Sequence, residues 1–163
     1  QKASGVDFEL GYDFEALEGS FKTRLIGTYL IERKDYPFQD DPSNFIEAAG
    51  TSGEAKWQAN LSVSYSIDRF FSTVETRFID EVDLYTNVEL AQNSNPNSNM
   101  SYGKYFITDM TVGYSFDSGV GVKVGVDNLF NRELPYGTRG TGAGSASYDN
   151  IGRFGYVSFS YKL

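Results

Sequence analysis

The reactive side chains of this sequence are carboxylates, tyrosines, lysines and arginines, because histidine and cysteine are both absent. Without histidine, the commonest general base and the commonest neutral metal ligand are missing. Without cysteine, neither a disulfide nor a thiolate metal site can form. Hydrolysis would have to run on Ser, Lys or carboxylates alone, and the sequence holds no recognisable catalytic constellation. We therefore predict no catalytic residue and no enzyme.

Carboxylates gather in one alternating segment and in two later stretches. They comprise Asp7, Glu9, Asp13 and Glu15, then Asp35, Asp40, Asp41 and Glu47, and then Asp80, Glu81 and Asp83. Oxygen ligands of this kind suit Ca²⁺, but their spacing does not match an EF-hand loop. The other interpretation of the first group is a wetted wall whose acids pair with Lys22, Arg24 or another part of the protein. We predict no metal site and no cofactor.

Aromatic residues and an arginine in polar stretches could receive a sugar, a haem or an anionic iron chelate. We predict ligand contacts from Tyr85, Tyr136 and Arg139, against the alternative of loop packing or contact with lipopolysaccharide. The glycine-rich stretches at 119–121 and 140–144 do not match a phosphate-binding loop, because neither is followed by the required lysine and helix. The net charge of −8 argues against a nucleic-acid partner.

The elements that must position these residues are strands, because apolar residues recur at every second position. At 56–67, Trp57, Leu61 and Tyr65 share one face, and serine, asparagine and glutamine share the other. A helix would instead place apolar residues three and four positions apart. The alternation predicts seven strands, at 6–16, 20–33, 56–67, 70–83, 105–116, 120–127 and 153–163. The predicted fold class is all-β, an antiparallel transmembrane barrel segment of about seven long strands.

The connections between these strands alternate in length. Short turns fall at 17–20, 67–69 and 117–119, and long polar loops at 34–54, 84–103 and 131–149. A strand of roughly 12 residues is about 40 Å long, and at a tilt of ~40° it rises about 30 Å, enough to cross the ~25 Å apolar band of an outer-membrane barrel. Short turns on one side and long loops on the other are also typical of such barrels.

Alternation alone does not say whether the apolar face points outward to lipid or inward to a core. A soluble lipocalin-like ligand-binding barrel has the same period. A complete small outer-membrane barrel, structural or adhesive, is a further alternative, which would need an eighth strand such as 47–53. An odd number of antiparallel strands cannot close, because the first and last would run parallel. We therefore expect one domain over residues 1–163 that is part of a larger barrel.

Two segments near the C-terminus resemble TonB-dependent outer-membrane receptors. The first is Val124-Gly125-Val126-Asp127 followed by Asn128-Leu129-Phe130-Asn131-Arg132-Glu133, which is similar to the family's penultimate strand. The second is Gly152-Arg153 followed by an alternating strand to the C-terminus, which is similar to the family's last strand. The resemblance is specific over about the last 40 residues, and the upstream rhythm of strands and loops extends it over nearly the whole chain.

The resemblance implies an outer-membrane receptor of a Gram-negative bacterium that takes up a nutrient, such as an iron chelate, haem, cobalamin or oligosaccharide. It also implies contact with outer-membrane lipid and lipopolysaccharide, with the remainder of the barrel and a plug domain, and with the TonB system through that plug. The full barrel has about 22 strands, so this chain would supply roughly a third. In such receptors the last strand is the signal for the barrel-assembly machinery, here Gly155, Val157, Phe159, Tyr161 and Leu163, although Leu163 departs from the usual Phe or Trp.

Overall fold

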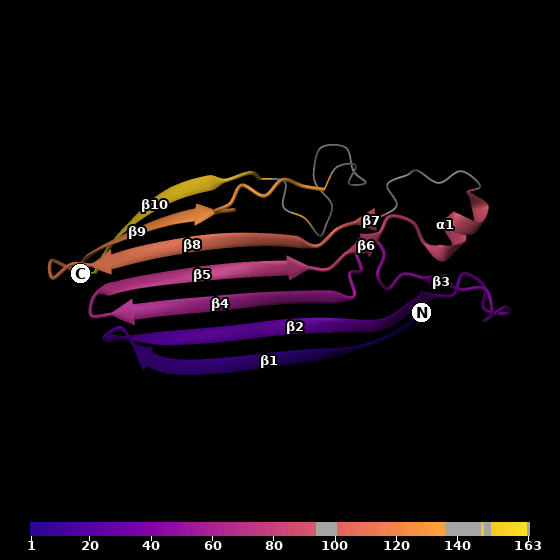
Figure 1. Ribbon diagram of the computed structural model, residues 1–163, viewed down its shortest axis with the longest axis horizontal. Helices are drawn as coiled ribbons and strands as arrows, with labels where there is room; N and C mark the ends of the chain where they lie inside the picture. The colour runs from indigo at the N-terminus through magenta and orange to yellow at the C-terminus, as the bar shows by residue number, and fades with distance from the viewer. Residues whose placement is uncertain (94–100, 136–147, 149–150, 163) are drawn as a thin grey trace.

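A single curved sheet dominates the computed structural model, which describes residues 1–93, 101–135, 148 and 151–162. The strand order is β1-β2-β4-β5-β8-β9-β10, and a short β3 pairs with β2 off this path. The bounds are Lys2–Ala16 for β1, Gly19–Asp35 for β2, Ile46–Glu47 for β3, Trp57–Ile67 for β4, Phe70–Ile79 for β5, Tyr105–Ser115 for β8, Val120–Asp127 for β9 and Phe154–Tyr161 for β10. Neighbours pair antiparallel, which confirms the predicted fold class (Figure 1).

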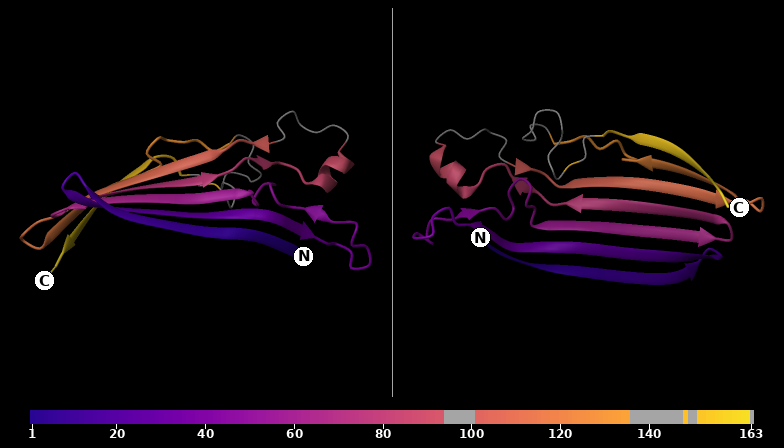
Figure 2. Two further views of the ribbon diagram at one scale, coloured as in Figure 1. Left: turned by 60° about the horizontal axis from the view of Figure 1, so that its bottom comes forward. Right: turned by 180° about the vertical axis from the view of Figure 1, so that it is seen from behind.

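The two ends of the sheet differ. The short turns and the C-terminus lie at one end, and the long connections and the N-terminus lie at the other (Figure 1). Figure 2 shows the sheet twisting from β1 to β10. Because every neighbouring pair on the seven-strand path is antiparallel, β1 and β10 run in the same direction. The two edges therefore cannot pair with each other in the antiparallel manner of an outer-membrane barrel, and the sheet stays open.

The register sorts the side chains into two faces, because successive residues of a strand point to opposite sides. The apolar face carries Leu10, Leu25, Leu61, Thr76 and their alternating neighbours, which are partners across β1, β2, β4 and β5. The polar face carries Ser62 and Ser64 of β4 and their partners. Between the short turns and Gly5 of β1, the charged strand residues all fall on the polar face. These are Asp7, Glu9, Asp13, Glu15, Lys22, Arg24, Glu75, Arg77, Asp109, Lys123 and Asp127.

Two rows of aromatic rings border the apolar face. Near the loops, the Tyr29 ring lies 4.4 Å from Trp57, and the next pair of strands places Phe78 4.8 Å from Phe106. Near the short turns, the row comprises Phe14, Phe21, Tyr65, Phe70 and Tyr114. About eight residue steps separate Trp57 from Tyr65, or roughly 26 Å along the strand. At a tilt of ~40° this length rises about 20 Å, so the two rows lie near the edges of the ~25 Å apolar band, as the aromatic girdles of a membrane barrel do.

The long connections carry secondary structure that the sequence pattern did not predict. Val82–Asp83 (β6) pairs with Ser101–Tyr102 (β7) in a separate sheet, so the prediction of one strand over 70–83 is wrong beyond Ile79. The reason is that Val82 is buried in a loop cluster instead of continuing the wall. The cluster comprises Ala55, Ile79, Val82, Tyr102, Tyr105, Ile107 and Tyr148.

A helix, α1 (Asn87–Gln92), lies inside the second predicted loop. It begins with a capping box, in which the Thr86 hydroxyl accepts from Glu89 N–H and the Glu89 carboxylate accepts from Thr86 N–H. Within the described residues, no helix is long and apolar enough to cross a membrane. The alternative of a wall strand at 47–53 is also wrong, because only Ile46–Glu47 joins the sheet, at the outer end of β2.

Glycines on the polar face make room for aromatic rings of the neighbouring strand. Gly113 of β8 is the register partner of Phe71, and Gly125 of β9 is the partner of Tyr156. A Cβ at either glycine would overlap carbon atoms of the partner's ring. The ring therefore covers the backbone of the glycine and fills the space that a side chain at that position would occupy.

We expect Gly113→Ala to destabilise the barrel by about 1–3 kcal/mol, because a methyl group must displace the Phe71 ring from a packed position. Gly11→Ala is the matched control, since a Cβ there would only meet the Thr23 carbonyl oxygen at 4.0 Å. Urea unfolding of the full-length protein in lipid vesicles measures both changes. Equal midpoints for the two variants would contradict the packing assignment.

Candidate functional site

A row of three carboxylates crosses the polar face. Glu75 of β5 is the register partner of Asp109 of β8. Asp127 of β9 lies next in the row, because the preceding pair is Met110 with Val126. Like charges directly opposite one another destabilise a sheet. The row therefore needs water or a cationic group on its open side.

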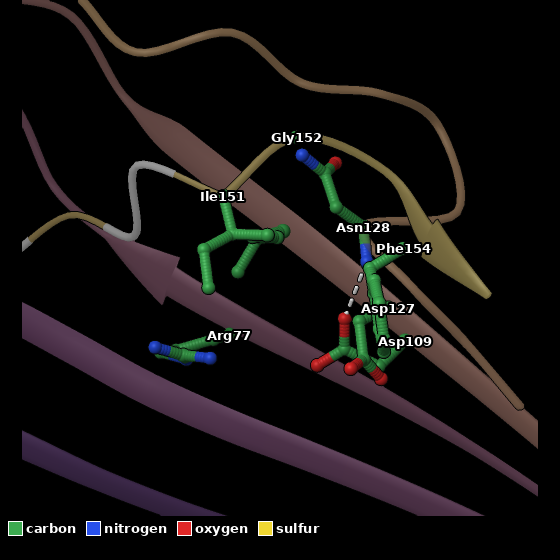
Figure 3. Close-up of a pocket in the computed structure, with 8 residues that line it drawn as sticks. Arg77, Asp109, Asp127, Asn128, Ile151, Gly152 and Phe154 are labelled. Carbon is green, nitrogen blue, oxygen red and sulfur yellow. Dashed lines mark hydrogen bonds between the residues drawn. The ribbon is translucent and has the colours of Figure 1, made fainter. Parts of the chain in front are cut away.

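A hollow of about 410 Å³ lies beside this row, at the loop end of β8, β9 and β10. It is lined by Arg77, Ile107, Asp109, Asp127, Asn128, Ile151, Gly152 and Phe154. Figure 3 shows the Asp109 and Asp127 carboxylates side by side and the Arg77 guanidinium on the other side of the opening. Within the described part of the chain, Arg77 has no ion pair closer than 4 Å. The hollow thus offers a carboxylate pair and a separate guanidinium to a ligand or to another protein segment.

Asn128 closes one side of the hollow and is only 2% exposed. Its backbone N–H donates to Asp109 Oδ1 at 2.7 Å. Its side-chain amide donates to the Arg132 carbonyl at 2.9 Å, and its Oδ1 accepts from Arg132 N–H at 2.6 Å. The residue has a φ of 52°, a conformation that asparagine tolerates better than most residues. Asn128 therefore ends β9, turns the chain and fixes the Asp109 carboxylate.

The two segments that carry the family resemblance meet at this turn. Asn131 Oδ1 accepts from Arg153 N–H at 3.1 Å, and Gly152 lines the hollow. Phe130 is 75% exposed and Leu129 N–H continues the ladder by donating to the Thr108 carbonyl. The motif residues thus join the two ends of the last long connection, where it leaves β9 and where it enters β10.

Two of the four acids on the polar face of β1, Glu9 and Asp7, have partners within the wall. Arg24 Nε donates to Glu9 Oε1 at 2.7 Å, and the Thr28 hydroxyl donates to Asp7 Oδ1 at 2.7 Å. The interpretation of this group as a wetted, paired wall fits Glu9 and Asp7. Among the described residues, no group of three or more Asp or Glu side chains is arranged to hold a metal ion.

The last long connection is anchored through Tyr148. Its ring lies 5.0 Å from Tyr105 at 80°, and 6.3 Å from Tyr102 at 87°. Burial, with smaller effects from these two tyrosines, raises the pKa of the Tyr148 phenol above its usual value. Because the neutral phenol is favoured in the fold, this residue contributes no pH dependence near neutrality. It weakens the fold only as the pH rises past about 10, where an unfolded tyrosine ionises.

The ligand contacts predicted from the sequence are not brought together in the described residues. Tyr85 lies between β6 and α1 and is half-buried, whereas Tyr136 and Arg139 lie outside the described residues. The sequence pattern did not single out Arg77, Glu75, Asp109 and Asp127 as a group. The alternation places each of them on the polar face of its own strand, but only the register between strands shows that they are neighbours.

The residues predicted as an assembly signal form one edge of the apolar face. Gly155, Val157, Phe159 and Tyr161 are register partners of the alternating valines of β9. Val157, Phe159 and Tyr161 are exposed along the open edge strand. Leu163 lies outside the described residues. A row of exposed apolar side chains on an unpaired edge suits recognition by another strand or by lipid.

Comparison with known proteins places these features in a family. The family described as "TonB dependent receptor-like, beta-barrel" matches residues 1–129. The ferric enterobactin receptor PirA of Pseudomonas aeruginosa is 29% identical over 141 residues, which cover 86% of this chain and 18% of that receptor. The chain thus spans about a fifth of that relative's length. No solved structure matches.

Replacing Asn128 with alanine should loosen the last long connection, because it leaves the Arg132 N–H and carbonyl without their partners and strains a left-handed residue. Unsatisfied buried groups cost about 1–3 kcal/mol each. We expect faster protease cleavage after β9 in the full-length protein. Asn60→Ala on the exposed polar face of β4 is the control. Equal cleavage rates in both variants would show that Asn128 does not hold the turn.

Proposed function

This chain belongs to the TonB-dependent receptor β-barrel family, and we propose that it forms the C-terminal wall strands of an outer-membrane receptor for nutrient uptake. Family membership makes the chain part of an outer-membrane receptor and not of an enzyme. The proposal extends to the plug domain and the TonB partner, which would lie in or act through parts of the protein beyond these 163 residues. Uptake energy would reach the plug from the inner membrane.

One observation carries the proposal. Between the short turns and Gly5 of β1, the apolar face of the seven strands carries no charged residue and is bounded by two aromatic rows, while the charges of the same stretch line the other face. Lipid tolerates the first face, and a wetted lumen tolerates the second. A soluble lipocalin-like barrel would need the apolar face enclosed, whereas this sheet is open. A complete small barrel would need an even number of wall strands.

An anionic iron chelate is the nutrient class that we propose. The support is the printed name of the relative, a ferric enterobactin receptor, and the presence of tyrosine and arginine in the loop-end segments. Tyr85, Tyr136 and Arg139 are the proposed contacts, because phenol groups donate hydrogen bonds and a guanidinium pairs with the anionic oxygens of a chelate.

The last strand is proposed to contact two further partners. The exposed Val157, Phe159 and Tyr161 support the role of Gly155, Val157, Phe159, Tyr161 and Leu163 as the signal read by the barrel-assembly machinery. After assembly, the open edges of β1 and β10 would pair with the remainder of the barrel, because unpaired backbone groups cannot remain in lipid.

The test is binding and uptake of radioactive ferric chelates by cells that depend on the full-length receptor. Tyr85→Ala should weaken binding by about tenfold, since truncating an aromatic contact typically costs ~1–2 kcal/mol. Phe38→Ala, at an exposed aromatic of the first long connection, is the control. Uptake of a different nutrient with no ferric-chelate uptake would overturn the ligand class. Loss of the receptor without loss of any uptake would overturn the transport role.

A further inference from the structure

The first long connection, between β2 and β4, is joined to the second, between β5 and β8, by backbone hydrogen bonds. Asp83 N–H donates to the Gly50 carbonyl at 2.8 Å, and the Asp83 carbonyl accepts from Ser52 N–H at 2.9 Å. Asp83 thus bonds to both neighbours of Thr51, with which it forms an isolated parallel bridge. One residue that bonds to both neighbours of its partner is the pattern of a parallel ladder. The bridge ties the end of β6 to the first connection.

The side chain of Asn87 repeats this pattern farther along the second connection, where α1 lies beside β3 (Figure 1). Its Oδ1 accepts from Glu47 N–H at 3.0 Å, and its Nδ2 donates to the Phe45 carbonyl at 3.2 Å. Both groups lie on the edge of β3 that faces away from β2, because the next N–H, that of Ala48, donates to the Arg33 carbonyl of β2. The carboxamide therefore takes the place of one residue of a parallel strand beside β3. We call this pair of hydrogen bonds the Asn87 link.

The Asn87 link needs an acceptor and a donor on one flat group, which a carboxamide provides and a carboxylate does not. Asn87→Asp keeps nearly the same shape, but its second oxygen would face the Phe45 carbonyl without a proton between them. The change removes one hydrogen bond and places two acceptors against each other. It does not weaken α1 itself, because an acidic side chain in the first turn of a helix is favourable.

Tyr85 lies between the two contacts of the second connection with the first. Before it, Asp83 bonds to the first connection and Leu84 packs against the loop cluster. After it, Thr86 begins α1 with its capping box, and Asn87 binds beside β3. This short segment is fixed at both ends. The place of Tyr85 is therefore set by the contacts that its neighbours make with another loop.

The part of the first connection that receives the Asn87 link is anchored to the wall. Arg33 N–H of β2 donates to a Glu47 carboxylate oxygen at 3.3 Å, and the Arg33 guanidinium pairs with Glu54. Next to β3, the Phe45 ring lies 6.2 Å from that of Tyr36, the residue that follows β2. The Asn87 link thus attaches the second connection to a segment that is itself held by a wall strand.

We propose that Asn87 is a positioning residue, which joins the first and second long connections into one unit and holds Tyr85 in place for ligand binding. The ligand part rests on the proposed function, in which Tyr85 contacts an anionic iron chelate. Asn87 acts through the link and not by touching the chelate. A segment that is already fixed loses less conformational freedom when a ligand binds, so the link raises the affinity.

The first test measures the Asn87 link without a ligand. Spin labels replace the exposed Gln39 of the first connection and the exposed Gln92 at the end of α1, in the full-length receptor in bilayers. We expect a narrow distribution of label distances in the parent and a broader one in Asn87→Asp.

Asn44→Asp is the matched control, because it adds the same charge beside Phe45 at an exposed residue whose side chain has no hydrogen bond to another described residue. The control should keep the narrow distribution of label distances. Equal widths in Asn87→Asp and in the control would overturn the link.

The second test measures the affinity of the full-length receptor for ferric enterobactin. We expect Asn87→Asp to bind about fivefold more weakly, because the link is lost, and Asn44→Asp to bind like the parent. In a receptor that already carries Tyr85→Ala, Asn87→Asp should cause no further loss, because the residue that it positions is gone. A further fivefold loss in that background would overturn Tyr85 as the residue that Asn87 positions.

The two tests separate this proposal from the proposed function. A parent that binds no ferric enterobactin would remove the proposed ligand class, and the label distances would still support the link if they are broader in Asn87→Asp and overturn it if they are not. Broader distances with an unchanged affinity for ferric enterobactin would overturn the positioning role and leave the ligand class intact.

Discussion

Backbone hydrogen bonding in an apolar medium is the constraint on which this structure depends. Within lipid, each peptide N–H and C=O needs a partner, because no water is present to supply one. The continuous antiparallel ladder from β1 to β10 meets that need for the inner strands. The same ladder fixes side-chain parity, so a slip of one residue would turn Lys22, Arg24 and Arg77 toward lipid. Each such charge would cost about 2–4 kcal/mol at the bilayer midplane, which makes the observed register strongly preferred.

The departures from the ladder occur where the constraint relaxes. At the loop end, a bulge in β2 changes which side chains face outward, and Asn128 ends β9 with a left-handed turn. The Glu75, Asp109 and Asp127 row is unfavourable as a sheet feature, and it is tolerated because the polar face is wetted. Charge and irregular backbone thus gather at the loop end and on the inner side. Those are the places where a receptor must meet its ligand and its own remaining segments.

The strands could be predicted from the sequence because one face of each strand meets lipid and the other meets water, so that apolar and polar residues alternate. The predicted segment at 120–127 matches β9 in full, and 56–67 differs from β4 by one residue. The connections could not be predicted in this way, since they have no single wet face. The alternation places Val82 in the wall because it is apolar and in phase with Phe78, but tertiary packing with Tyr102 draws it into the loop cluster. The helix α1 had a readable signal, the Thr86 and Glu89 capping pair.

The candidate site depended on information that a single strand does not carry. In the sequence, Asp109 and Asp127 look like ordinary polar-face residues, and only the strand register shows that they are neighbours. Only the hollow shows that Arg77 faces this carboxylate pair. The proposed ligand contacts Tyr136 and Arg139 lie in the last long connection, outside the described residues. The alternation predicted the wall strands well, whereas the grouping of charged side chains on the wall could be found only from the pairing of neighbouring strands.

The apolar face points toward lipid, and one pair of labelled variants tests this direction. A fluorophore at position 61, replacing Leu61, and another at position 62, replacing Ser62, would be placed separately in the full-length receptor in bilayers. We expect a lipid-soluble quencher to reach the label at 61 and a water-soluble quencher to reach the label at 62. A label at 61 that is shielded from the lipid-soluble quencher, with 62 open to water in a sample free of lipid and detergent, would contradict the membrane wall.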